Sequence, residues 1–168
     1  FLSSDISSFG RYRYELDDRA RDGELEPVFE IFNVFRARTE ERIAYALTLL
    51  EQEPDFTIDE SFRFDRSEMA WPSTEEEIQD VWRRHVKNAG LSLVLTGKTW
   101  EETAEILQER YERVLTRIVQ LTADDVFATF MNAMAHTMDP HSSYMSPRDS
   151  EEYRIQMSLS YDGIGASL

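Results

Sequence analysis

The stretch DPHSSYMSP, residues 139–147, separates two parts of the chain that have different patterns. Before it, apolar side chains recur every three or four residues, which is typical of amphipathic helices. After it, MSLSYDGIGA at residues 157–166 places an apolar residue between two glycines, as at the start of a strand. Since Asp-Pro commonly ends a helix and begins a turn, we expect a helical body, a turn and then a strand.

The composition favours an all-α class. The chain has 168 residues, enough to bury a core, and its 6 Gly and 5 Pro lie mostly between the periodic segments. It has no Cys, which excludes disulfides, thiolate nucleophiles and zinc–thiolate sites. The sequence has no apolar run long enough to predict a membrane-spanning segment.

Start and stop signals predict five or six helices. The first begins at the capping residues Ser3 to Asp5 and ends at Gly23. The others begin at Glu26-Pro27, at Ser73-Thr74, at a Thr99–Glu102 capping box and at a Thr122–Asp125 capping box. Residues 91–95 alternate briefly, so a short strand is an alternative there to a helix closed by Gly97. The expected apolar stripes include Phe35 and Ala46 in the second helix, Leu107 and Tyr111 in the fourth, and Met138 in the fifth.

Residues 54–72 lack helical periodicity but carry four aromatic residues, Phe56, Phe62, Phe64 and Trp71. A disordered linker would not hold so many. We expect an ordered loop whose rings pin it to the helices. The alternative is a partner-binding surface, because exposed aromatic residues mark interfaces.

The formal net charge is −15, from 33 acidic and 18 basic residues. Such a surface opposes nucleic-acid phosphates, so we expect no nucleic-acid partner. Only two of the basic residues are lysines, Lys87 and Lys98, and a Ser–Lys catalytic pair would need one of them.

Two kinds of chemistry can be considered around the 139–147 stretch. His136, Asp139 and His141 are candidate metal ligands, although their spacing is not that of a zincin. Ser142 and Ser143 beside His141 suggest a nucleophile and its base, but adjacent residues seldom have that geometry and no nucleophile elbow is present. We favour a structural turn, with Tyr144 and Met145 as its anchors.

A Gly-apolar-Gly loop that leads into a strand can direct backbone N–H groups at a carboxylate. The strand edge beside it can accept an extended peptide. Gly163-Ile164-Gly165 has this pattern, but glycines at tight turns are common and the tripeptide alone does not define a binding site.

Together these segments resemble the N-terminal part of tail-specific, or C-terminal processing, serine proteases. The turn motif is similar to the one that precedes the PDZ domain in that family, and its residues are Asp139, Pro140, His141, Ser142, Ser143 and Tyr144. The carboxylate-binding loop of that PDZ domain resembles Gly163, Ile164, Gly165 and Ala166. Upstream segments that resemble the family are residues 1–6, Asp65-Arg66-Ser67, Trp71-Pro72, residues 91–93 and residues 96–99.

The resemblance implies a helical N-terminal domain at residues 1–145, followed by a linker and the start of a PDZ domain at 146–168. It implies a periplasmic parent endopeptidase whose PDZ domain engages apolar C-terminal tails and whose Ser–Lys dyad lies beyond these residues. Neither lysine falls in a matching motif, so we expect no catalytic residue, cofactor or metal here. A TPR-type lipoprotein adaptor and self-association are further implied partners. With no leader sequence and a last strand without a partner, we expect a fragment.

Two rival functions remain at this point. One is a free-standing helical interaction protein that uses residues 54–72. The other is a metal hydrolase that uses His136, Asp139 and His141.

Overall fold

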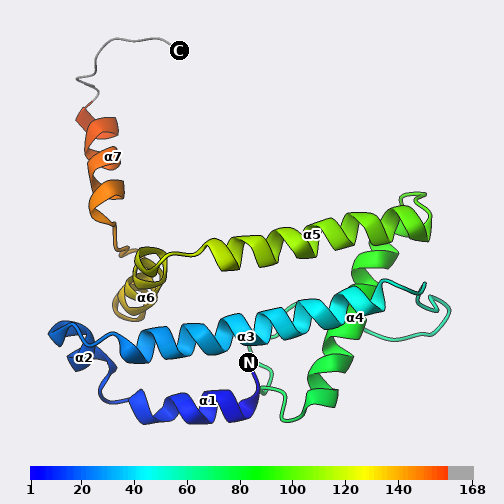
Figure 1. Cartoon of the computed structure of the whole chain (residues 1–168), viewed down its shortest axis with the longest axis horizontal. Helices are drawn as coiled ribbons and strands as arrows, with labels where there is room; N and C mark the ends of the chain where they lie inside the picture. The colour runs from blue at the N-terminus through cyan, green and yellow to red at the C-terminus, as the bar shows by residue number, and fades with distance from the viewer. Residues whose placement is uncertain (159–168) are drawn as a thin grey trace. The chain divides into compact units, whose positions relative to one another are not determined.

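The computed structural model describes residues 1–158, and every regular element in that range is a helix (Figure 1). The elements are α1 (Ser3–Phe9), the 3-10 helix η1 (Gly10–Tyr12), α2 (Leu16–Asp22), α3 (Glu26–Leu49), α4 (Glu75–Val94), α5 (Trp100–Gln120), α6 (Ala123–Met138) and α7 (Pro147–Ser158). The all-α class is confirmed for these residues, with seven α-helices in place of the five or six predicted. The predicted strand and the Gly163–Ala166 loop lie outside the described residues.

The chain divides into two compact units, Phe1–Leu121 and the part from Thr122 onward. The first unit holds α1 to α5, and the second holds α6 and α7. The predicted domain boundary after residue 145 stays a prediction. No helix of the described range has both the length and the apolarity that crossing a bilayer requires.

The first predicted helix, over residues 3–22, is interrupted by η1. Its N-cap is Leu2, not one of the predicted capping residues. The backbone N–H of Leu2 donates to the carboxylate of Asp5 at 2.8 Å, and Arg38 donates to the same carboxylate at 2.9 and 3.0 Å. Asp5 therefore both caps the start of α1, from the third helical position, and binds α3. Gly23, with φ of 80°, ends α2 as predicted.

Three helices, α3, α4 and α5, share the main core. α3 and α5 run antiparallel beside each other, and α4 crosses both (Figure 1). Each contributes fully buried side chains, namely Ile43 and Ala46 from α3, Val86 from α4 and Leu107 from α5. Fully burying one large aliphatic side chain stabilises a fold by roughly 1.5–3 kcal/mol.

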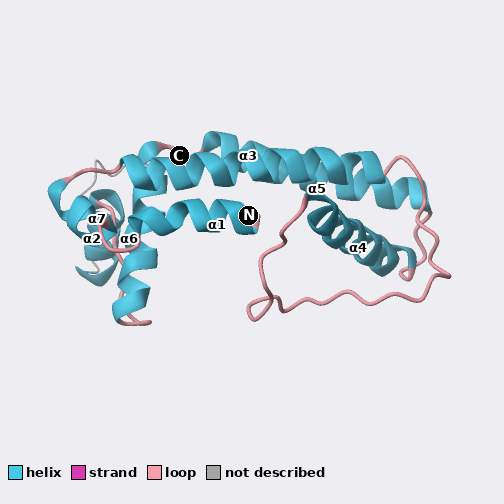
Figure 2. Cartoon of the chain, turned by 90° about the horizontal axis from the view of Figure 1, so that it is seen from below, coloured by secondary structure: helices cyan, strands magenta, loops and turns pink. Residues whose placement is uncertain are grey.

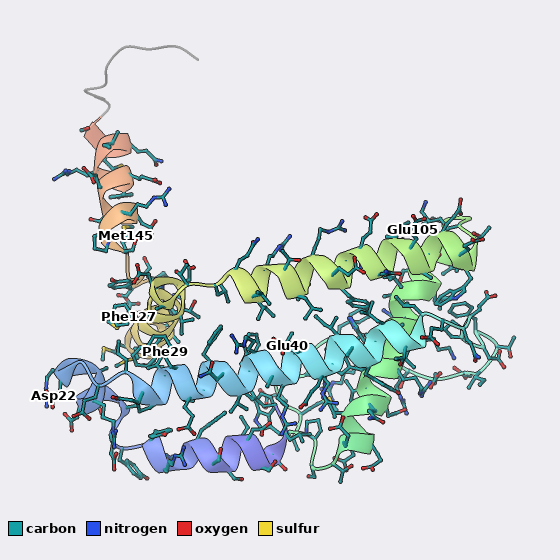
Figure 3. The ribbon with its side chains drawn as sticks, viewed as in Figure 1. Asp22, Phe29, Glu40, Glu105, Phe127 and Met145 are labelled. Carbon is teal, nitrogen blue, oxygen red and sulfur yellow. The ribbon has the colours of Figure 1, made fainter. Side chains whose placement is uncertain are left out.

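The predicted stripes are confirmed at Ala46, Leu107 and Tyr111, which are all buried. They are wrong at two positions, because Phe35 is 41% exposed and Met138 is 81% exposed. Acidic residues such as Glu40 on α3 and Glu105 on α5 are exposed (Figure 3). The position of a residue in an apolar stripe therefore shows which side of the helix faces the core. It does not show how far along the helix the core extends.

The helix starts follow their capping signals. Thr74 accepts a hydrogen bond from the backbone of Glu77 at 3.2 Å. The Thr99–Glu102 and Thr122–Asp125 pairs each form both bonds of a capping box. Helix α4 continues to Val94, so residues 91–94 are helical and the alternative strand is excluded. Gly97, with φ of 94°, follows the end of this helix.

α4 and α5 approach each other closely at Gly90. A Cβ atom at this position would lie 2.8 Å from Cζ3 of Trp100, a distance that real Cβ contacts essentially never show. Trp100 in turn packs edge-on against Phe56, with ring centroids 6.2 Å apart. The absence of a side chain at Gly90 therefore makes room for the indole between α4 and the loop.

The connection between α3 and α4 is a long loop that passes alongside α4 (Figure 2). Besides Phe56, two of its rings are anchored, Phe62 on His85 at 5.6 Å and Trp71 on Phe1 at 6.1 Å between centroids. The predicted ordered loop, pinned by aromatic residues, is confirmed. Phe64 is the exception, being 79% exposed with its ring against Phe62.

A charged cluster also fixes this loop to α4. The carboxylate of Glu60 accepts hydrogen bonds from Arg83 at 2.9 and 2.6 Å and from Lys87 at 2.6 Å. Lys87 also donates to the backbone oxygen of Ile58 at 3.1 Å. The hydrogen bonds from Arg83, and then those from Lys87, hold the pKa of Glu60 at about 2, well below its usual 4.5.

Residues 146–158, predicted as a linker that leads to a strand, instead contain α7. Ser146 caps this helix, exchanging hydrogen bonds with Asp149 at 2.8 and 3.2 Å, and Pro147 occupies its first position. The Ser-Pro-x-Asp pattern is a start signal, but the segment has no apolar stripe by which a helix would be recognised. In keeping with this, α7 buries none of its side chains.

Replacing Gly90 by Ala should destabilise the first unit by about 1–3 kcal/mol, because the new methyl group overpacks the Trp100 contact. Denaturant unfolding followed by circular dichroism measures the change. The matched control is Gly10→Ala, where a Cβ meets nothing within 4 Å. Equal stability of the two variants would contradict the tight contact.

Glu60→Gln should lower the free energy of unfolding by about 1.5–3 kcal/mol near neutral pH, because it removes a charged acceptor from Arg83 and Lys87. The folded-state pKa of Glu60 is depressed, so its contribution is complete above about pH 4.5 and is lost as the pH falls towards about 2. The difference between wild type and variant should shrink over that window. Glu53→Gln, at an exposed position in the same loop, should show no such pH-dependent difference.

Candidate functional site: the turn after α6

The turn begins where α6 ends. The backbone N–H of Asp139 still bonds to Ala135, at 2.9 Å, but its own backbone is extended, with φ of −151° and ψ of 120°. The next residue is Pro140, which disfavours helical backbone at the residue before it. The chain therefore leaves the helix at Asp139, as the Asp-Pro pair predicted.

The carboxylate of Asp139 organises the turn. It accepts hydrogen bonds from the backbone N–H of His141 at 3.0 Å and from the hydroxyl of Ser142 at 2.9 Å. The Nδ1 atom of the His141 ring lies 3.2 Å from it. The backbone hydrogen bond from His141, followed by the bond from Ser142, lowers the pKa of Asp139 from its ordinary value. The carboxylate stays ionised and acts as an acceptor for the turn rather than as a general acid.

A second set of contacts ties the end of the turn to α6. The backbone N–H of Tyr144 donates to the side-chain oxygen of Asn132 at 2.9 Å, and the amide of Asn132 donates to Ala128 at the same distance. The Tyr144 ring packs edge-on against Phe127, with centroids 5.6 Å apart. Tyr144 is thus an anchor, as predicted.

Met145, the other predicted anchor, is 43% exposed at the start of α7 (Figure 3). Asn132 takes the anchoring part instead, a residue that the sequence did not single out. Its only signal is that it is a polar residue amid the apolar side of α6.

The turn does not assemble a nucleophile and a base. The hydroxyl of Ser142 donates to Asp139 and not to His141, and the side chain of His141 is 92% exposed. Lys87 is also committed elsewhere, since its amine bonds Glu60 and Ile58.

The metal interpretation gains no support. Within residues 1–158, no group of three or more His, Asp or Glu side chains could hold a metal ion. Asp139 and His141 lie together, but they do so as parts of the turn, and His136 does not complete a site with them.

The class of protein these observations define is an all-helical domain without a catalytic centre among its described residues, ending in a tightly hydrogen-bonded turn and a further helix. A sequence model of the tail-specific protease N-terminal domain matches residues 1–148, which includes this turn. The chain is also 38% identical to a tail-specific protease of Haemophilus influenzae over 169 residues. The chain therefore belongs to the tail-specific protease N-terminal domain family, and the predicted resemblance is confirmed.

That alignment covers 100% of this chain but 24% of the relative. The chain thus spans about a quarter of the length of the protease it matches. The protease activity of such a relative is a property of a much longer chain.

Removing the organising carboxylate should loosen the turn. Asp139→Ala deletes the acceptor of the His141 backbone N–H, and exchange of that amide with solvent should accelerate several-fold, because an amide without its hydrogen bond exchanges more readily. Hydrogen exchange followed by NMR measures this. Asp139→Asn keeps a side-chain oxygen and should leave exchange nearly unchanged. If the His141 amide of Asp139→Ala exchanges no faster than that of the wild type, the carboxylate does not hold the turn.

Proposed function

We propose that this chain is the helical scaffold and regulatory domain of a periplasmic tail-specific serine endopeptidase. The family match over residues 1–148 is the observation that carries the proposal. In this function the domain supports a PDZ domain and a protease core and shapes the access of substrates to them. The protein substrates are those with apolar C-terminal tails.

The turn after α6 is suited to joining such parts. Its residues bond mainly to one another, through Asp139, and to α6, through Asn132 and Phe127. A segment held in this way can transmit a displacement of the next domain to the helix that precedes the turn, as a hinge does. We assign recognition of the tail to a PDZ domain whose carboxylate-binding loop includes Gly163, Ile164, Gly165 and Ala166.

The bond-breaking step belongs to residues beyond this chain. We assign it to a Ser–Lys dyad there, and we infer that the chain alone is inactive. This assignment agrees with the engagement of Lys87 by Glu60 and of Ser142 by Asp139.

The loop of residues 54–72 offers a surface for an adaptor of the TPR-lipoprotein type or for a second copy of the protein. Two of its aromatic residues are open to solvent, Phe64 at 79% exposure and Trp71 at 50%. Large exposed rings of this kind favour protein contacts. This docking function complements the scaffold function and does not require catalysis by the chain.

The test uses the longer protein, with a folded substrate offered in two forms, with and without an apolar C-terminal tail. Asn132→Ala removes the side-chain acceptor that holds Tyr144 and should reduce the ratio of tailed to untailed cleavage several-fold, while the thermal stability of the first unit is kept. Asn88→Ala, an asparagine on α4 in the other unit, is the control.

An unchanged cleavage ratio in Asn132→Ala would remove the hinge from the proposal. Tail-specific cleavage by residues 1–168 alone would overturn the assignment of the chemistry to the missing part.

A further inference from the structure

Residues 61–65 of the loop between α3 and α4 are attached to the helices at few points. Within this segment Phe62 alone is not exposed. Its ring packs against that of His85 on α4, with centroids 5.6 Å apart. Among the described residues, the one hydrogen bond from a helix to the segment runs from Arg84 to the backbone oxygen of Ser61 and is 3.3 Å long. The contact between Phe62 and His85 is therefore the main anchor of the segment.

The loop is held on both sides of this segment by contacts that mild acid does not alter. Glu60 precedes the segment and accepts hydrogen bonds from Arg83 and Lys87, which hold its pKa at about 2. Trp71 follows the segment and packs on Phe1, and neither of these rings titrates. Both attachments consequently stay in place as the pH falls to about 5, far above the pKa of Glu60.

His85 has no acceptor waiting for a second ring proton. Its ring is partly buried and contacts Phe62 of the loop and Trp82 of α4, whose centroid lies 5.4 Å away. Within residues 1–158, neither ring nitrogen forms a hydrogen bond or an ion pair. A proton on this ring would add both a charge and a second donor to apolar surroundings, which costs free energy.

The charged groups around His85 do not offset this cost. The ionisable side chains on the adjoining parts of α4 and the loop are Asp59, Glu60, Arg63, Asp80, Arg84 and Lys87. Asp59 is exposed, and the other two acids already pair with cations of α4. On α5, Arg110 repels a further positive charge, and the hydroxyl of Tyr111 stays neutral because burial raises its pKa. Burial, followed by the charge of Arg110, lowers the pKa of His85 from its ordinary value of 6.5.

We propose that residues 61–65 detach from α4 when His85 takes up a proton, while the loop on either side stays in place. The docked segment favours the neutral imidazole, so docking is complete above about pH 6.5 and weakens as the pH falls below that value. Detachment uncovers Phe62 beside Phe64, which is already 79% exposed, and so enlarges the apolar surface of the loop. The inference goes beyond the proposed function, since it gives the loop two states between which pH selects.

NMR of residues 1–168 tests this switch through the ring signals of His85 and Phe62. In the wild type, a nuclear Overhauser effect should join the two rings at neutral pH and should weaken several-fold once the His85 signals reach their acid limit. His85→Gln should remove the pH dependence of the Phe62 signals. His136→Gln, an exposed histidine of the other unit, is the control and should leave that dependence unchanged.

A second pair of variants tests the same coupling from the loop side, because docking and protonation affect each other reciprocally. Phe62→Ala removes the ring that covers His85 and should raise the pKa of His85 towards 6.5. The matched control is Ile58→Ala, at a position of the same loop that is 57% exposed, and it should leave this pKa unchanged. Circular dichroism confirms that each variant is folded.

Three outcomes would each overturn the proposal. The first is a pKa of His85 at or above 6.5 in the wild type, which would mean that the neighbouring rings stabilise the imidazolium. The second is an Overhauser effect that persists on the protonated ring, and the third is an equal effect of Phe62→Ala and Ile58→Ala. None of these outcomes decides the proposed function, which stands or falls on tail-dependent cleavage by the longer protein.

Discussion

The contact between Gly90 and the Trp100 ring sets the distance between α4 and α5, and the rest of the first unit is built around it. A small residue at a helix crossing allows the two backbones to approach closely. Here the Trp100 indole occupies the space that a side chain at position 90 would need. Because Trp100 also meets Phe56, the same ring couples the helical core to the long loop. Core packing and loop placement are consequently parts of one arrangement.

Ion pairs also hold separate segments of this acidic chain together. Some ion pairs join segments that are distant in sequence, as at Asp5 with Arg38 and at Glu60 with Arg83 and Lys87, whereas others, such as Glu109 with Arg113, lie within one helix. Ion pairs that are partly shielded from water in this way are worth more than those on open helix faces.

Local signals were enough to predict much of this fold. Hydroxyl caps and capping boxes predicted the starts of α4, α5 and α6, and the left-handed glycines predicted the ends of α2 and α4, because these signals depend on bonds within one turn of helix. Features that depend on distant contacts could not be predicted. The break at η1 accompanies the use of Asp5 by Arg38, 33 residues away. The exposure of Met138 depends on where the core ends, and α7 has no stripe by which to be found.

At the candidate site, the sequence predicted the turn and its first residue, Asp139. It did not predict that Asn132 holds the other end of the turn. Asn132 bonds Tyr144 across 12 positions, and no spacing rule predicts such a pair. The Asp65-Arg66-Ser67 segment was singled out only through the family resemblance.

Because α7 buries none of its side chains, it unfolds differently from the core when the protein is heated. A twelve-residue helix that buries no side chain gains nothing from a core, and isolated helices of this length are marginal in water. Its helix content is then governed by its cap and by intrinsic propensities. On warming, α7 will fray gradually over a broad range of temperature, whereas the α3–α4–α5 core will melt in one sharp step.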